Sequence, residues 1–117
     1  MKIFEQDDKI NFVDENNVFV GFDSYQSCCE DFGWEISDPS GVIIVPDTDF
    51  TGYVFDKFYF EEKTPESSYD VGGAVTFRLT KNEEEIFLTL WNYHNGYYAH
   101  GFDFTDSEGK IIKEGTL

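Results

Sequence analysis

The sequence predicts a mostly β domain of the α+β class. We expect an antiparallel rolled sheet or small sandwich of about seven or eight strands with one short helix. Apolar and polar residues alternate along much of the chain, and helical periodicity is scarce. Aromatic residues make up 19% of the chain, enough large apolar side chains to build a core. With 117 residues the chain has the length of one domain, so we expect residues 1–117 to form a single acidic domain.

The first predicted element is a hairpin. Residues 10–13 and 18–23 have strand composition, and they flank the turn-forming run Asp14-Glu15-Asn16-Asn17. Ser24 then suits the N-cap of the one short helix, which we expect to run from Tyr25 to Phe32.

That helix would turn its apolar residues inward and end at a glycine. Cys28, Cys29 and Phe32 would face the core, with Glu30 and Asp31 outward. Gly33 would terminate the helix, and residues 34–36 would resume an extended chain.

The middle of the chain predicts two more strands and a loop. Residues 41–45 form a short apolar run bounded by Pro39 and Pro46, which predicts a buried strand. Residues 53–60 alternate less cleanly, and their phenylalanines suggest a strand covered on both faces. Residues 64–73 have loop composition.

The strongest alternation lies in the second half of the chain. Residues 74–80 place Val75, Phe77 and Leu79 on one face and polar residues on the other, which is typical of an antiparallel sheet. Further on, the dipeptide Asn95-Gly96 favours a two-residue type I′ turn.

We expect that turn to close a hairpin of aromatic cross-strand pairs. The predicted register pairs Phe87 with Phe104 and Trp91 with His100 on one face, and His94 with Tyr97 on the other.

The chain is strongly acidic, and its charge excludes several classes of partner. The 24 Asp and Glu residues against eight Lys and Arg give a formal net charge of −16. This charge opposes direct binding to nucleic acid and to anionic membrane surfaces. No apolar run approaches the roughly 18 residues of a membrane-spanning helix.

The N-terminal residues and the cysteines predict a cytoplasmic protein. The N-terminal segment lacks the apolar stretch of a secretory signal. Cys28 and Cys29 are adjacent, a spacing that suits a disulfide poorly. Reduced thiols are the rule in the cytosol.

The residues that suggest catalysis or metal binding are Cys28, Cys29, His94 and His100. Zinc-ligating cysteines usually have two or more residues between them, and the predicted register puts the two histidines on opposite faces. Neighbouring acids would raise the thiol pKa rather than activate a nucleophile. We therefore expect no enzyme activity, no cofactor and no metal site, with a metal- or thiol-dependent enzyme as the alternative.

The distribution of acids is the most informative remaining feature. No Lys or Arg lies between Lys9 and Lys57, and that segment holds ten acids. A field of one sign speeds encounter with an oppositely charged partner. The alternative is that these acids only keep the protein soluble. The residues that we predict to contact a partner are Asp14, Glu15, Asp23, Glu30, Asp31, Glu35, Asp38, Asp47, Asp49 and Asp56.

Two short motifs carry a resemblance to a known family. Cys28-Cys29-Glu30 follows the extended polar-aromatic segment Phe22-Asp23-Ser24-Tyr25, and Asn95-Gly96-Tyr97-Tyr98 comes late in the chain. This combination resembles a family of small uncharacterised proteins from phages and bacteria. The resemblance covers about a dozen residues. It implies a setting of mobile elements and their hosts, where small acidic inhibitors are common, and it implies no catalytic residue.

These observations predict a non-enzymatic acidic inhibitor. We expect it to dock on a basic surface of another protein, a nucleic-acid-handling enzyme or a toxin, as phage anti-defence and immunity proteins do. A structural component of a phage particle is a third hypothesis.

Overall fold

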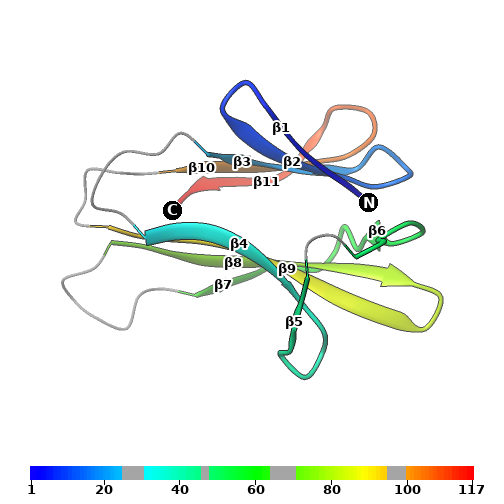
Figure 1. Cartoon of the computed structure of the whole chain (residues 1–117). Helices are drawn as coiled ribbons and strands as arrows, with labels where there is room; N and C mark the ends of the chain where they lie inside the picture. The colour runs from blue at the N-terminus through cyan, green and yellow to red at the C-terminus, as the bar shows by residue number, and fades with distance from the viewer. Residues whose placement is uncertain (25–30, 46–47, 64–70, 95–99) are drawn as a thin grey trace.

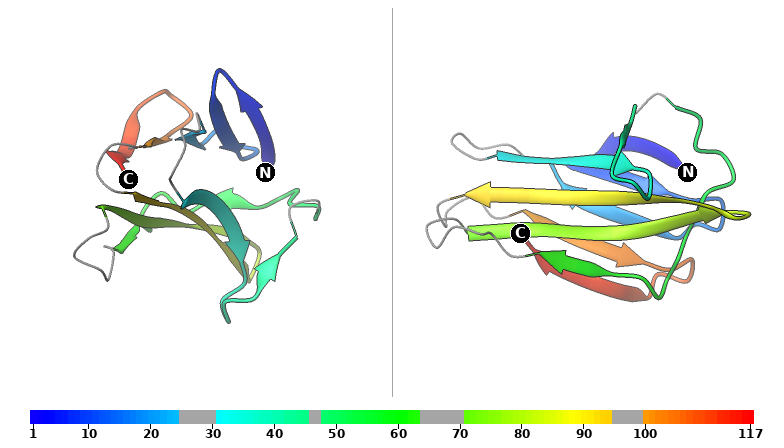
Figure 2. Two further views of the ribbon diagram at one scale, coloured as in Figure 1. Left: turned by 60° about the vertical axis from the view of Figure 1, so that its left-hand side comes forward. Right: turned by 90° about the horizontal axis from the view of Figure 1, so that it is seen from below.

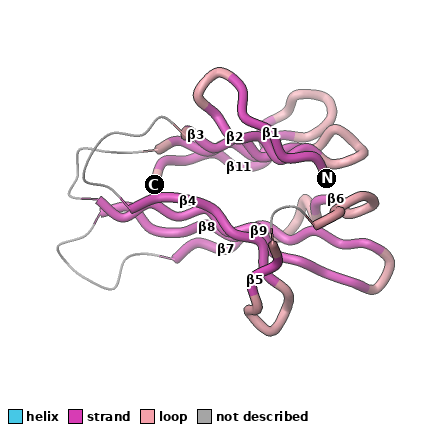
Figure 3. The backbone as a smooth tube through the Cα atoms, in the orientation of Figure 1, coloured by secondary structure: helices cyan, strands magenta, loops and turns pink. Residues whose placement is uncertain are grey.

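The computed structural model describes residues 1–24, 31–45, 48–63, 71–94 and 100–117. The side chains of Asp31, Val71 and His94 are outside the description. The described residues form eleven strands in two antiparallel sheets, which lie one above the other in Figure 1. The predicted number of about seven or eight strands is therefore too low. Figure 3 colours only strands and loops, because the described part of the chain contains no helix. It therefore contains no helix that is long and apolar enough to cross a membrane.

Sheet A combines the beginning and the end of the chain. Its strand order is β1-β2-β3-β10-β11. The bounds are β1 Lys2–Gln6, β2 Lys9–Val13, β3 Phe19–Asp23, β10 Gly101–Thr105 and β11 Ile111–Thr116. The predicted hairpin of residues 10–13 and 18–23 is confirmed, since β2 pairs antiparallel with β3. The central strands β3 and β10 also pair with each other, although they lie far apart in the sequence.

Sheet B holds the middle of the chain. Its order is β5-β4-β9-β8-β6, and β7 also pairs with β8. The bounds are β4 Asp31–Ser37, β5 Ile43–Ile44, β6 Val54–Phe55, β7 Glu61–Lys63, β8 Val71–Lys81 and β9 Glu84–His94. The right-hand view of Figure 2 shows the long strands β8 and β9 running side by side. The buried face of Val75, Phe77 and Leu79 in β8 is confirmed.

Aromatic side chains fill the space between the two sheets. Phe77 of sheet B contacts Phe104 of sheet A with ring centroids 5.1 Å apart, and the two rings meet edge to face. Phe12 of sheet A makes a similar contact with Trp34 of sheet B, also at 5.1 Å. Edge-to-face pairs of this kind add to the apolar burial that holds the layers together.

The predicted hairpin around Asn95-Gly96 is wrong. β9 pairs with β4 and β8 in sheet B, whereas β10 pairs with β3 and β11 in sheet A. The hairpin of β9 is instead closed with β8 across Asn82 and Glu83, where Asn82 adopts a φ of 55°. A two-residue turn needs such positive φ values, which Asn tolerates well. Residues 95–99, including Asn95-Gly96, lie outside the described residues.

The predicted short helix is not seen. Phe32 and Gly33 belong to β4, which pairs with β9 from Asp31 to Ser37. The pairing of β4 along its whole length outweighs the helix-capping tendency of Ser24, because tertiary contacts override a weak helix propensity. The predicted extension of residues 34–36 is confirmed, and residues 25–30 lie outside the description.

The two predicted strands in the middle are much shorter and more exposed than expected. Within residues 41–45 only Ile43–Ile44 form a strand, and Ile43 is 53% exposed. That strand lies at the edge of sheet B, the place where prolines are tolerated. Within residues 53–60 only Val54–Phe55 form a strand, and Phe58 is 97% exposed. Of the predicted loop 64–73, Val71 to Gly73 belong to β8 and the rest is outside the description.

Candidate functional site

The structure does not gather the ten predicted contact acids on one face. Asp23 lies at the end of β3 in sheet A, whereas Glu35 lies in β4 of sheet B. Glu30 and Asp47 lie outside the described residues, as does the side chain of Asp31. The others occupy turns or pair with cations, as described next.

Asp14 is a structural residue of the core edge. It is 5% exposed, and its Oδ1 accepts hydrogen bonds from the backbone N–H groups of Asn16 at 2.8 Å and Val18 at 3.0 Å. Its Oδ2 accepts a third bond, at 2.9 Å, from the backbone N–H of Phe55 in β6. The side chain therefore shapes the β2–β3 turn and ties it to sheet B.

Three other predicted acids bind the backbone of turns. Asp38 Oδ1 accepts bonds from the Ser40 hydroxyl at 2.6 Å and from the backbone N–H of Val42 at 3.0 Å. These bonds, with that of the Ser40 hydroxyl the strongest, lower the pKa of Asp38. Asp49 binds Thr51 in the same way, which lowers the pKa of Asp49. Glu15 Oε1 accepts a bond from the backbone N–H of Gly52 at 2.9 Å.

Asp56 is neutralised by a cation. The Nη1 of Arg78 lies 3.2 Å from Asp56 Oδ2, and the Nε of Arg78 lies 2.6 Å from Glu85 Oε2. The guanidinium of Arg78 therefore pairs with two carboxylates. Asp56 consequently adds little to the negative electrostatic potential that a partner would meet.

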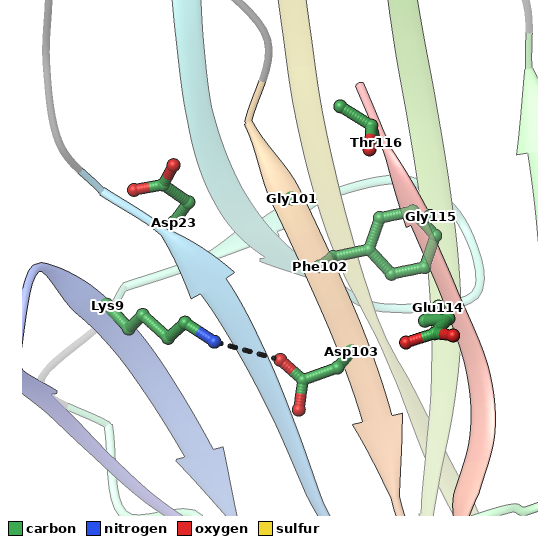
Figure 4. Close-up of a pocket in the computed structure, with 8 residues that line it drawn as sticks. All are labelled: Lys9, Asp23, Gly101, Phe102, Asp103, Glu114, Gly115 and Thr116. Atoms are coloured by element: carbon green, nitrogen blue, oxygen red, sulfur yellow. Dashed lines mark hydrogen bonds and ion pairs between the residues drawn. The ribbon is translucent and has the colours of Figure 1, made fainter.

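Three carboxylates line one groove on the outer face of sheet A (Figure 4). Asp23, Asp103 and Glu114 reach it from the neighbouring strands β3, β10 and β11. Among the described residues, the groove is also lined by Lys9, Gly101, Phe102, Gly115 and Thr116. The left-hand view of Figure 2 shows hairpin β1–β2 and hairpin β10–β11 rising on either side of the outer face of sheet A.

The strand register explains why these three acids lie on one face of sheet A. Asp103 lies opposite Gly21 on one neighbouring strand and opposite Glu114 on the other, so these positions share one face. Asp23 lies opposite Lys9 in the same way. Because alternate residues face outward, Phe102 and Phe104 enter the core while Asp103 between them points out.

A glycine makes room for the central carboxylate. A Cβ added at Gly21 would lie 2.9 Å from Asp103 Oδ1, so the carboxylate crosses the space that a larger residue would fill. The Nζ of Lys9 lies 3.4 Å from Asp103 Oδ1, and the hydroxyl of Thr105 donates to Asp103 Oδ2 at 3.2 Å. Asp103 is thus held in place, while the Lys9 side chain that pairs with it is 51% exposed.

Residues suited to other chemistry do not assemble within the described residues. Cys28 and Cys29 lie outside the description, as does the side chain of His94. His100 is 1% exposed, stacks on Phe32 at 4.1 Å between ring centroids, and has its Nδ1 2.6 Å from the backbone oxygen of Asp23. Among the residues described, no group of three or more His, Cys, Asp or Glu side chains could hold a metal ion.

The comparisons with known proteins assign a family. The family described as "Domain of unknown function (DUF7448)" matches residues 1–104. The chain belongs to this family. No curated protein and no solved structure matched the chain. The family match includes the groove residues Lys9, Asp23 and Asp103 and ends before Glu114.

Asp103 and Glu114 were not predicted from the sequence to contact a partner. Both lie outside the cation-free segment, and the predicted pairing of Phe87 with Phe104, which is wrong, placed the adjacent Asp103 opposite Leu88 of β9. The available signal was the alternation of Phe102, Asp103 and Phe104, which puts a carboxylate on the outer face of a strand with a buried inner face.

Proposed function

We propose that this protein is a non-enzymatic binding protein that docks on a basic surface of a partner protein and blocks it. The groove of Asp23, Asp103 and Glu114 forms the centre of the contact. The partner class that suits such a surface is a cytoplasmic nucleic-acid-handling enzyme or toxin, because these proteins present cationic grooves to phosphates. The observation that supports the proposal is that three carboxylates from three adjacent strands line one groove, with the Asp103 carboxylate lying across Gly21.

The groove suits an arginine or lysine side chain of the partner. Asp103 is already oriented by Thr105, so a guanidinium meets a carboxylate that needs little reordering. Lys9 can move aside, because its pair with Asp103 is long and its side chain is half exposed. The net charge of −16 adds long-range attraction that accelerates encounter at low salt.

A salt-controlled capture experiment tests this proposal. The immobilised wild-type protein is incubated with host lysate at low and high ionic strength, beside the double variant Asp103→Asn/Glu114→Gln. We expect a captured protein that is released by salt and that the double variant retains at least about tenfold less well, because the variant loses two charges at the contact.

The matched control removes the same charge from sheet B. Glu62→Gln/Glu83→Gln changes two exposed acids in β7 and in the β8–β9 turn, away from the groove. Docking through the groove would be contradicted if the amount of captured protein did not depend on ionic strength. It would also be contradicted if that amount fell equally in both double variants.

A further inference from the structure

Apolar side chains cross the outer face of sheet A beside the carboxylate groove. They are Phe4 on β1, Val13 on β2, Phe19 on β3 and Ile111 on β11, and we name them the apolar strip. Phe4 is 43% exposed and Ile111 is 50% exposed, while Val13 and Phe19 are half-buried. Each has a chain neighbour that packs in the core, and these neighbours are Ile3, Phe12, Val20 and Ile112. Because successive side chains of a strand alternate between its faces, the strip points outward.

The strand register makes the strip continuous. Val13 lies opposite Phe19 on the neighbouring strand. Thr105 lies opposite Phe19 on one side and opposite Ile111 on the other, so it connects these two strip residues. Phe4 joins the strip at its other end, because Phe4 and Val13 line one hollow of about 490 Å³.

The strip adjoins the carboxylates of the proposed docking groove. Asp103 and Thr105 are two residues apart on β10, and the hydroxyl of Thr105 donates to Asp103 Oδ2 at 3.2 Å. Glu114 lies opposite Asp103, just as Ile111 lies opposite Thr105. Two residues of an extended strand span about 6.8 Å, so the row of carboxylates and the apolar strip run side by side.

The charges of this face are separated across the sheet. The described residues include every strand residue of sheet A, so all charged side chains at its outward positions can be named. They are Lys2 and Lys9 on β1 and β2, and Asp23, Asp103 and Glu114 on β3, β10 and β11.

The two ends of the strip therefore differ in their charged neighbours. The charged groups of the hollow beside Phe4 are the Met1 ammonium, Lys2, Asp14 and Glu15. The β10–β11 turn next to Ile111 adds Asp106, Glu108 and Lys110. The half of the strip formed by Phe19 and Ile111 lies on the side of the face where the outward strand residues are acidic.

We propose that the partner docks with an amphipathic surface, which places an apolar side chain on the strip and cationic side chains in the groove. This inference rests on the proposed function and specifies the chemistry of the same partner. Apolar anchors surrounded by polar contacts carry much of the affinity of protein interfaces. Salt screens the attraction between charges, whereas the burial of apolar surface against Phe19 and Ile111 persists at high salt. A second copy of this chain is a poor occupant, because it would bring like carboxylates and a further net charge of −16 to the same face.

Short peptides that match the spacing of the two rows test this inference. Alternate residues of an extended peptide face the same side, so the peptide Ac-Arg-Gly-Arg-Gly-Phe-NH₂ presents two guanidinium groups and one aromatic ring together. The matched control is Ac-Arg-Gly-Arg-Gly-Ala-NH₂, and both peptides are also used with the order of residues reversed. Each is titrated into the ¹⁵N-labelled full chain at an ionic strength of about 20 mM, where screening is weak. We expect saturable amide shifts in β3, β10 and β11, and we expect at least one Phe peptide to bind at least about threefold more tightly than its Ala control.

The variant Ile111→Ser should abolish this preference for the Phe peptide and leave the affinity for the Ala peptide unchanged. The matched control is Ile43→Ser, because Ile43 is 53% exposed and lies on sheet B. Thermal unfolding will establish that both variants are folded. The inference is overturned if neither Phe peptide binds more tightly than its Ala control, if the shifts map to sheet B, or if both variants lose the preference equally. A dimer in sedimentation experiments that Ile111→Ser dissociates would also overturn it, and would assign the strip to a second copy.

This inference and the proposed function can fail separately. If the Phe and Ala peptides bind equally while salt-sensitive capture still requires Asp103 and Glu114, the apolar contact is overturned and docking through the groove stands. If capture does not depend on salt, docking through the groove is contradicted whatever the peptides show.

Discussion

The two outer faces of the sandwich differ although both belong to antiparallel sheets of similar width. On sheet A the outward positions around β10 carry carboxylates, and that of Asp103 lies over Gly21. On sheet B the outward positions of β9 carry Trp91 and Tyr93 beside Gly33 and Ala74. The inner faces are alike, since both are covered by large apolar side chains. The alternation of apolar and polar residues along the strands therefore specifies the common core. It does not specify which side chains occupy the outer faces, so the two outer faces can differ.

The glycines of the two faces illustrate the difference. Beside Gly21 lies the end of a carboxylate side chain, which can rotate away from an added methyl group. Beside Gly33 lies a rigid indole, which can move only as a whole. The same substitution should therefore affect the two faces differently.

Replacement of Asp14 should have the largest effect on stability, because its carboxylate connects the β2–β3 turn of sheet A to β6 of sheet B. Asp14→Ala leaves three backbone N–H groups, two of them in buried hydrogen bonds, without their carboxylate acceptor. We expect the free energy of unfolding to fall by about 3 kcal/mol, measured by urea denaturation. Glu83→Gln, an exposed change of one charge, should leave it within about 0.5 kcal/mol. A loss below about 1 kcal/mol for Asp14→Ala would show that the tie between the β2–β3 turn and β6 contributes little.

Gly33→Ala should disturb the aromatic face. The added Cβ would lie 2.8 Å from the Trp91 ring, so the indole must tilt outward. We expect a loss of about 1 kcal/mol in unfolding free energy and a red shift of the tryptophan emission. The Trp34 contribution is removed by measuring the change in a Trp34→Phe background. Emission that stays the same would mean that the indole does not rest on Gly33.

Gly21→Ala should act on the carboxylate face with little cost in stability. The methyl group displaces the Asp103 carboxylate from the groove, and we expect the unfolding free energy to change by less than about 1 kcal/mol. Salt-sensitive capture of the partner should fall, while the amide shifts of sheet B stay as in the wild type. Disturbed shifts on both faces would show that the two surfaces are not independent.

The smallest effect concerns a turn that belongs to neither face. Hydrogen bonds in the folded state hold the pKa of Asp38 below its ordinary value of 3.8. Since the folded pKa is the lower one, the stability that Asp38 contributes is present above its unfolded pKa and is lost as the pH falls through the folded pKa. An NMR titration should give a pKa below 3.8, and Ser40→Ala should move it upward. If Ser40→Ala leaves the pKa of Asp38 unchanged, the Ser40 hydroxyl is not the main cause of the lowered pKa.

Local pattern predicted part of the fold and little of the candidate site. The hairpin of residues 10–13 and 18–23 and the buried face of Val75, Phe77 and Leu79 depend on neighbours in the chain, and both predictions are confirmed. The partners of β9 could not be predicted in this way, because both of its faces hold large apolar or aromatic residues. The alternation of apolar and polar residues alone was therefore also compatible with the incorrect pairing of β9 with residues 97–104.

The sequence by itself determined that the chain is acidic, mostly β and rich enough in aromatic residues to bury a core. Only the tertiary structure decided which carboxylates share a surface: it buried Asp14, paired Asp56 with Arg78, and brought Asp103 beside Lys9, 94 positions away. The physical reason is that alternation acts within a strand, whereas the order of strands in a sheet results from the packing of the whole chain.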